Sequence, residues 1–198
     1  MRLILASTSP RRKDLLRSAG VNFTVIPPIG VDERPQRGES PRQIVFRLSL
    51  QKAQSVFEGL GWRKKNSVVL GVDTLVSLEG GKRILGKPKD EADALRMLRW
   101  ISGCEHTVHT GYCLVTLHQR PHCRAFRTKV RMRKVSVDHL RAYVRTGEPM
   151  GKAGAYAAQG RGMGLIESIQ GSYTNIVGLP LAQVLSDLET RFSDVLAL

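Results

Sequence analysis

Strand-like and helix-like segments alternate along this chain, with one β-hairpin among them, and this order restricts the fold more than any other feature. The chain opens with a short apolar run, residues 3–6, that ends abruptly in three hydroxyl residues. Pro10 follows Ser9 where a helix can begin, because the first helical position needs no N–H donor, and Gly20 ends that helix. The start of the chain is therefore predicted to form a strand, a tight turn and a helix.

Similar patterns predict the remaining elements. Apolar residues at helical spacing predict four further helices, over 41–58, 90–102, 136–147 and 181–192. β-rich runs predict strands over 68–78, 107–118 and 125–136, and two glycine-rich strand-like segments come after residue 147. The polar Gln-Arg-Pro-His turn before residue 125 indicates a hairpin. A mixed-sheet α/β fold is therefore favoured over a purely parallel one.

The composition is that of a globular domain. With 198 residues, 41% hydrophobic and 24% charged, the chain can bury a sizeable core, so one domain over 1–198, with room for two lobes, is expected. The first apolar run is too short for a secretory signal, and no apolar stretch approaches the length of a membrane span. Three cysteines without a CxxC pair argue against a disulfide framework and for a reducing compartment. A cytoplasmic protein without membrane contact is expected.

The chain is strongly basic, with 31 Lys and Arg against 17 Asp and Glu and a net charge of +14. A basic surface attracts polyanions, so nucleic acid and a small phosphorylated substrate are both candidate ligands. Aromatic residues make up only 6% of the chain and are scattered, so they offer no stacking platform for single strands. A solvated surface that serves only solubility is the third interpretation.

Arg11 and Arg12 stand at the expected N-terminus of the first helix. The first N–H groups of a helix lack intrahelical partners and point outward, so this turn suits an anion, phosphate above all. Cations at this end oppose the helix dipole, so a negative group is expected to compensate them. The alternative is an ordinary capped helix with a solvated cationic first turn.

Two carboxylates are candidates for chemistry. Asp73 lies in a Gly-Val-Asp-Thr break inside an apolar run, where a buried charge is costly unless it is paired or bound to metal. Glu33 lies in a polar loop after Pro27 and Pro28. Among so many cations, the two carboxylates could hold Mg²⁺ and orient a water molecule against a phosphate. For Asp73 alone, a structural turn is the alternative.

Three apparent motifs are set aside. The segment 80–88 offers Pro88 where a P-loop needs a hydroxyl for Mg²⁺, although Lys87 can still present its ammonium to a phosphate. The histidines and cysteines between 104 and 123 lie mostly on expected strands, without the paired spacing of zinc ligands. The glycine run at 160–164 lacks the GxGxxG spacing.

Taken together, eight segments resemble the Maf family of nucleotide pyrophosphatases and occur in the family's order. They are LASTSPRR (5–12), VDE (31–33), Lys52 within QKA, GVDT (71–74), GKP (86–88), SG (102–103), GEPMGKAGAYAAQG (147–160) and GSYTNIVGLPL (171–181). The resemblance implies a twisted mixed sheet flanked by helices, with a deep substrate cleft, as in Ham1 and ITPase-like proteins. It also implies a homodimer that hydrolyses a nucleoside triphosphate to the monophosphate and pyrophosphate with a divalent metal, Mg²⁺ or Mn²⁺.

The resemblance further implies a role for each matching residue. Asp73 would accept a proton from the attacking water, and Glu33 would help Asp73 to hold the metal. The phosphate-binding positions would be Ser7, Arg12, Lys52 and Lys87. The positions that set base choice, in the branch acting on dTTP and UTP, would be Arg11, Thr74 and Gln159.

One position departs from the family pattern: Gly151 stands where the family commonly has Asp before Lys-Ala-Gly. If that Asp supports the loop or the metal, then loop rigidity or metal affinity differs in this chain. Nucleic acid is not required for the implied reaction. The alternative function is a basic nucleic-acid-binding or regulatory protein that keeps the same fold.

Overall fold

The computed structural model describes residues 1–195. These residues form two compact units. The first unit comprises Met1–Asp73, Thr110–Phe126 and the chain from Gly178 onward, and the second comprises Thr74–His109 and Arg127–Val177.

A seven-stranded mixed sheet runs through the chain in the order β2-β1-β3-β5-β6-β7, with β4 paired to β3. β1 pairs in parallel with β2 and β3, whereas the β3–β4 and β6–β7 pairs are antiparallel. The mixed sheet predicted from the sequence is therefore confirmed. The strands are β1 (Arg2–Ala6), β2 (Phe23–Val25), β3 (Ser67–Leu78), β4 (Arg83–Leu85), β5 (Glu105–Val115), β6 (His122–Met132) and β7 (Ile166–Gln170).

All five predicted helices are present. The α-helices are α1 (Pro10–Ser18), α2 (Pro41–Glu58), α3 (Glu91–Ile101), α4 (Val137–Val144), α5 (Tyr173–Val177) and α6 (Leu181–Arg191). Short 3₁₀ turns lie at Gly61–Asn66, Glu79–Gly81, Ala153–Ala155, Gly160–Leu165 and Ser193–Val195.

Only one strand, β7, forms between α4 and α5, so the expectation of two strands in this part of the chain is wrong. The preceding glycine-rich stretch forms 3₁₀ turns instead. Gly154 and Gly160 have φ of 72° and 67°, a left-handed conformation that turns the backbone away from an extended path.

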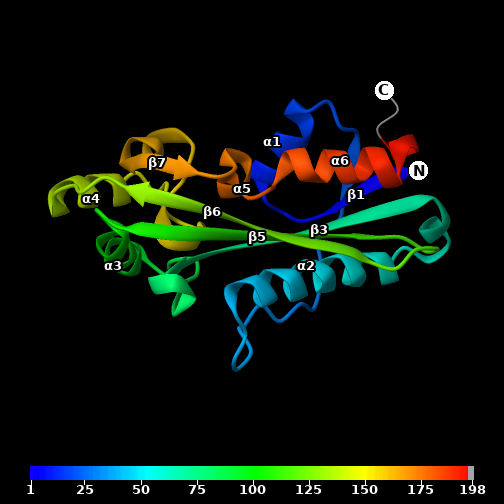
Figure 1. Ribbon diagram of the computed structural model, residues 1–198, viewed down its shortest axis with the longest axis horizontal. Helices are drawn as coiled ribbons and strands as arrows, with labels where there is room; N and C mark the ends of the chain where they lie inside the picture. The colour runs from blue at the N-terminus through cyan, green and yellow to red at the C-terminus, as the bar shows by residue number, and fades with distance from the viewer. Residues whose placement is uncertain (196–198) are drawn as a thin grey trace. The chain divides into compact units, whose positions relative to one another are not determined.

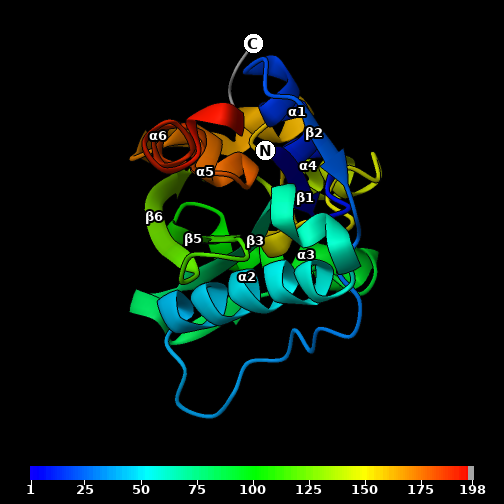
Figure 2. The same ribbon diagram turned by 90° about the vertical axis from the view of Figure 1, so that its right-hand side faces the viewer.

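Helices cover both faces of the strands in the first unit (Figures 1 and 2). On one face, Val68, Leu70 and Val72 of β3 pack with apolar residues of α1 and α6. On the other face, Val69 packs with Ala53 and other apolar residues of α2. The alternation follows from the two-residue period of a strand, and it makes β3 a buried central strand of this unit.

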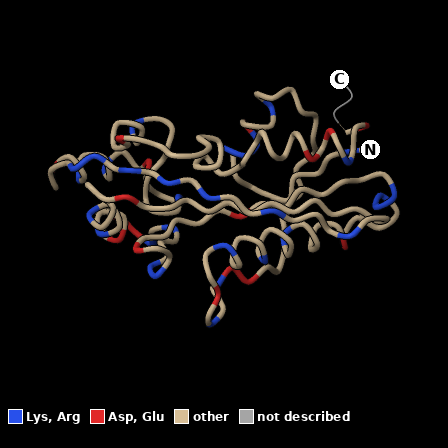
Figure 3. Tube along the Cα trace, viewed as in Figure 1, with Lys and Arg blue, Asp and Glu red and all other residues tan. Residues whose placement is uncertain are grey.

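The second unit has its own core. Val76 and Leu78, at the far end of β3, pack with Leu98 of α3 and with Leu140 and Val144 of α4. The excess positive charge is spread over many elements (Figure 3), and part of it forms an exposed row on β6 at Arg127, Lys129 and Arg131. That row contains none of the residues predicted to bind substrate.

The cysteine count leads to the wrong expectation about disulfides. Cys113 of β5 and Cys123 of β6 form a disulfide, while Cys104 is free and exposed. The Cα atoms of Cys113 and Cys123 lie 4.0 Å apart, because the hairpin brings β5 and β6 together. A count of cysteines cannot detect this effect. The cysteines therefore no longer argue for a reducing compartment. Among the described residues, no helix combines the length and the apolar character needed to cross a membrane.

Candidate active site

The close approach of α2 to β3 places the first two residues of the site. A Cβ at Gly71 would lie 2.1 Å from the carbonyl oxygen of Ser49 and 2.6 Å from the backbone nitrogen of Ala53, so only glycine allows this packing. Asp73 follows two residues later on β3 and therefore faces the same helix. Lys52 of α2 meets it there, with Nζ 2.6 Å from Asp73 Oδ1.

The predicted break at Asp73 is wrong. β3 is continuous from Ser67 to Leu78, and Asp73 is a buried strand residue, not a turn residue. The strand tolerates this carboxylate because an ammonium group lies against it, which offsets part of the cost of removing a charge from water.

Lys52 bridges two carboxylates. Its Nζ lies 2.6 Å from Glu33 Oε1 as well as 2.6 Å from Asp73 Oδ1. The side chains of Lys52 and Asp73 are 9% and 11% exposed, whereas that of Glu33 is 54% exposed. One end of this carboxylate–lysine–carboxylate group is thus buried, and the other end is open to solvent.

Arg12 is anchored beside these charges. Its Nε donates to the carbonyl oxygen of Gly178 at 2.9 Å, and one terminal nitrogen donates to Ser7 Oγ at 3.0 Å. Burial lowers the pKa of Arg12 to about 10, while the charges of Asp73 and Glu33 act in the opposite direction. These carboxylates supply the negative charge that was expected to compensate the cationic turn.

The turn before α1 differs in one detail from the prediction. Ser9 occupies the N-cap position, but its side chain makes no capping hydrogen bond. Its backbone N–H donates instead to Ser7 Oγ, at 3.2 Å. The buried Ser7 hydroxyl therefore accepts from both Ser9 and Arg12. Burial also lowers the pKa of the neighbouring Arg11.

Asp73 has a perturbed acidity. Burial raises its pKa above the usual 3.8, the positive charges of Lys52 and Arg12 lower it in part, and the nearby Glu33 raises it further. The net shift is upward because burial disfavours the charged form more than the cations favour it. A carboxylate with a raised pKa accepts a proton from water more readily than an exposed one.

The first unit thus brings together Asp73, Lys52, Glu33, Arg12 and Ser7 through contacts and electrostatic interactions, with Arg11 next to them in the chain. The other three predicted residues, Thr74, Lys87 and Gln159, belong to the second unit. Lys87 is exposed just after β4, and Gln159 is exposed just before the 3₁₀ turn at Gly160–Leu165. The deep substrate cleft implied by the resemblance stays a prediction.

The site contains two carboxylates that could hold a metal. Within residues 1–195, no group of three or more His, Cys, Asp and Glu side chains is arranged to bind an ion. Mg²⁺ nevertheless binds commonly through one or two carboxylates together with water and substrate phosphates. Glu33 and Asp73, which share one lysine, therefore fit a metal that arrives with a polyphosphate.

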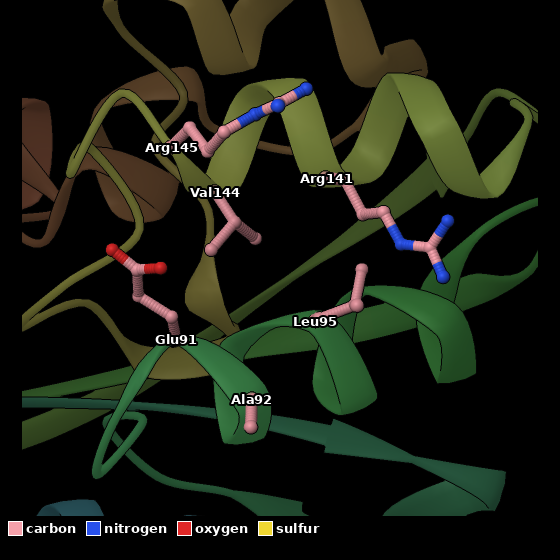
Figure 4. Close-up of a pocket in the computed structure, with 6 residues that line it drawn as sticks. All are labelled: Glu91, Ala92, Leu95, Arg141, Val144 and Arg145. Atoms are coloured by element: carbon pink, nitrogen blue, oxygen red, sulfur yellow. The ribbon is translucent and has the colours of Figure 1, made fainter.

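A shallow pocket of about 300 Å³ lies elsewhere, between α3 and α4 of the second unit (Figure 4). It is lined by Glu91, Ala92, Leu95, Arg141, Val144 and Arg145. None of the predicted site residues lines it.

Two residues that matter for the geometry were missed in the sequence. The carbonyl of Gly178 accepts from Arg12 across 166 positions of the chain, and no local pattern signals such a contact. Glu148 accepts backbone hydrogen bonds from Arg161 and Gly162, close to Gln159. The available signal was that Glu148 lies in the family-like segment 147–160 and Gly178 in the family-like segment 171–181.

The chain matches the family model described as "Maf-like protein" over residues 2–191. It belongs to the Maf-like family. Proteins named "dTTP/UTP pyrophosphatase" are similar over nearly their full lengths. The one from Moorella thermoacetica is 48% identical over 92% of this chain and 91% of its own. The one from Thermococcus kodakarensis is 44% identical over 98% of this chain and 99% of its own.

A third relative of this Maf-like protein, the dTTP/UTP pyrophosphatase of Pelotomaculum thermopropionicum, is 44% identical over 96% of both chains. Among solved structures, the nucleoside-triphosphatase / dITP/XTP pyrophosphatase of Mycobacterium abscessus is 14% identical, with a TM-score of 0.43, over 100% of this chain and 98% of its own.

Proposed function

We propose that this Maf-like protein is a hydrolase that converts dTTP and UTP to the nucleoside monophosphate and pyrophosphate. The names of relatives that are 44–48% identical over at least 91% of their lengths support this substrate class. The structural observation that carries the proposal is the group in which Lys52 Nζ lies 2.6 Å from both Asp73 and Glu33, with Arg12 beside it.

In the proposed reaction, water attacks the α-phosphorus and the bond to the oxygen that bridges the α- and β-phosphates breaks. Asp73 takes a proton from the attacking water, which its raised pKa favours. Pyrophosphate leaves with the electron pair of the broken bond. The developing negative charge lies on phosphoryl oxygens, where nearby cations stabilise it.

The cations have distinct proposed parts. Arg12, held in place by Ser7 and Gly178, presents its guanidinium to a phosphate. Lys52 keeps Asp73 charged in a buried position and offers its ammonium to the same substrate. Lys87, which is exposed on the second unit, would contribute a further point charge.

A divalent cation, Mg²⁺ or Mn²⁺, is part of the proposal. Glu33 and Asp73 are the residues that would hold it, since carboxylate oxygens are the ligands that both metals prefer. Such an ion neutralises phosphate charge and makes bound water more acidic.

Base choice is assigned to Gln159, with Thr74 and Arg11. A glutamine amide carries both a donor and an acceptor, so it can pair with the carbonyl and N–H edge that uracil and thymine share. Pairing of this kind rejects other bases more strongly than a single methyl group separates dTTP from UTP. The proposed substrates are therefore dTTP and UTP, together with modified pyrimidine nucleotides whose bases present the same carbonyl and N–H edge.

We also propose a cytoplasmic homodimer, on the basis of the family resemblance. Light scattering of the purified protein should give a mass of about twice the 22.0 kDa of one chain. A mass of one chain at micromolar concentration would remove the dimer from the proposal without affecting the reaction.

A panel of nucleoside triphosphates tests the reaction. With Mg²⁺ or Mn²⁺ present, kcat/KM for pyrophosphate release is expected to be at least about tenfold higher for UTP and dTTP than for CTP, ATP and GTP. The reason is that only uracil and thymine match the proposed pairing with Gln159. Ion chromatography of the products distinguishes pyrophosphate from orthophosphate.

The alternative function predicts another result on the same sample. A nucleic-acid-binding protein would bind duplex DNA or RNA with steep salt dependence and release no pyrophosphate. That outcome, or a preference for purine triphosphates, would overturn the proposed substrate class.

A further inference from the structure

The backbone around Gln159 is held on its N-terminal side by two tyrosines. The backbone N–H of Ala157 donates to the hydroxyl oxygen of Tyr143 at 3.1 Å. The hydroxyl of Tyr173 donates to the carbonyl oxygen of Ala158 at 2.9 Å. Gln159 itself is exposed, so its backbone is constrained while its side chain is available to a ligand.

The backbone after Gln159 is held by one carboxylate. Glu148 Oε2 accepts from the N–H of Arg161 at 2.9 Å, and Oε1 accepts from the N–H of Gly162 at 2.8 Å. The hydroxyl of Tyr143 donates to the same Oε1 at 2.9 Å. Glu148 therefore connects the turn after Gln159 with the tyrosine that holds the segment before it.

These contacts favour the ionised form of Glu148. Burial alone would raise its pKa, but the N–H groups of Gly162 and Arg161 and the Tyr143 hydroxyl bring the pKa below its ordinary value of 4.5. A carboxylate at neutral pH is an acceptor only, and hydrogen bonds to a charged acceptor are stronger than neutral ones.

Packing leaves little freedom at the same place. A Cβ at Gly160 would stand 2.7 Å from Glu148 Oε2, and the φ of this glycine is +67°. The carboxylate thus lies directly against the residue that follows Gln159, and the left-handed φ at this position favours glycine.

We propose that Glu148 is a positioning residue for base selection: it fixes residues 157–162 so that the Gln159 amide is presented to the pyrimidine in one orientation. This inference rests on the proposed function, in which Gln159 contacts the base. Discrimination by paired polar groups depends on geometry, and recognition constellations must be held to within about 0.5 Å. A misplacement of about 1 Å can lower the rate by about 100-fold.

A brace that serves stability alone predicts a different pattern. Loss of such a brace would lower Tm and reduce turnover of every triphosphate by the same factor. Loss of a positioning residue changes the ratio between substrates, because only the cognate base depends on the Gln159 amide. The binding of a phosphate chain that carries no base should then be unaffected.

The test compares Glu148→Gln with the wild type. The amide oxygen of the new glutamine can still accept from one of the two backbone N–H groups, those of Arg161 and Gly162. Its NH₂ group faces the other N–H, so that backbone hydrogen bond is lost. We expect kcat/KM for UTP to fall by about 10–100-fold and kcat/KM for GTP to change by less than about threefold. The inhibition constant of inorganic tripolyphosphate should stay within about twofold of the wild-type value.

Three further variants complete the test. Tyr143→Phe removes the hydroxyl that bonds to Glu148 and Ala157, so the UTP-to-GTP ratio should fall here as well, even if Glu148→Gln folds poorly. Glu189→Gln, which changes an exposed carboxylate, should leave the ratio unchanged. Added to Gln159→Ala, Glu148→Gln should cause no further loss of selectivity, because both changes act through the same amide.

The outcomes separate the two proposals. A wild type that releases no pyrophosphate, or shows no preference for UTP, overturns the proposed function and this inference with it. A selective wild type whose Glu148→Gln and Tyr143→Phe variants lose activity equally on UTP and GTP overturns the positioning role alone.

Discussion

Asp73→Asn is expected to lower kcat for UTP by about 10²–10⁴-fold, the range over which a positioned general base contributes. The asparagine amide has nearly the same shape as the carboxylate but accepts no proton from water. Lys52 keeps Glu33 as its other partner, so the neighbouring ion pair survives the change. Quenched assays of pyrophosphate release at saturating UTP would measure the decrease in kcat.

The fold should be retained in this variant. Tm is expected to change by less than about 5 °C, because the buried Lys52 ammonium keeps its ion pair with Glu33 when the Asp73 charge is removed. Asp14→Asn is the matched control, since Asp14 forms an exposed pair with Arg17, and it should have wild-type activity. Turnover within about threefold of wild type in Asp73→Asn would remove Asp73 from the role of base.

Lys52→Met is expected to reduce both stability and activity. Removal of one partner from a buried ion pair leaves the other charge uncompensated, which costs about 3–5 kcal/mol of unfolding free energy at neutral pH. The unbranched apolar side chain of methionine has nearly the length of the lysine stem and preserves most of its packing between α2 and β3. Denaturant unfolding measures the loss, and Lys65→Met, at an exposed position, serves as the control.

The pH dependence of this variant follows from Asp73. Burial raises the pKa of Asp73 above 3.8, and Lys52 opposes that rise, so without Lys52 the pKa moves further upward. A carboxylate whose pKa is higher in the folded state destabilises the fold as pH increases through that value. The loss of unfolding free energy in Lys52→Met should therefore be small at acid pH and largest at neutral pH.

Activity should respond in the same direction. The proposed base acts only when it is unprotonated, so the acid limb of kcat/KM should move to higher pH in Lys52→Met.

The double variant Lys52→Met/Asp73→Asn should be more stable at neutral pH than Lys52→Met, because both buried charges are gone. A double variant that is as unstable as the single one would contradict the pairing of these two residues.

Local signals account for the elements that were predicted well. The helix expected over 41–58 coincides with α2, which begins with a complete capping box formed by Ser40 and Gln43. The hairpin of β5 and β6 follows from two β-rich runs around a turn that contains Pro121. Each of these signals acts between residues a few positions apart, so a single sequence carries it in full.

Where the predictions failed, long-range contacts or the backbone conformation of single glycines decided the outcome. The supposed break at Asp73 is a continuous strand, because Lys52 pairs with a carboxylate that would otherwise be unfavourable inside a sheet. The supposed strand after residue 147 turns at Gly154 and Gly160, which adopt positive φ. The disulfide depends on the register of two strands, which no count of cysteines contains.

By itself, then, the sequence determined five of the six α-helices of residues 1–195, most strands, the mixed sheet and the residue types of a phosphate-binding site, because periodicity, caps and turns are local. Only the tertiary structure decided that Lys52 bridges Asp73 and Glu33, and that Arg12 donates to the carbonyl of Gly178. These pairs are 21, 19 and 166 residues apart in the chain. The Lys52–Asp73 contact depends on how α2 and β3 pack around Gly71, and packing of this kind is decided only in the folded chain.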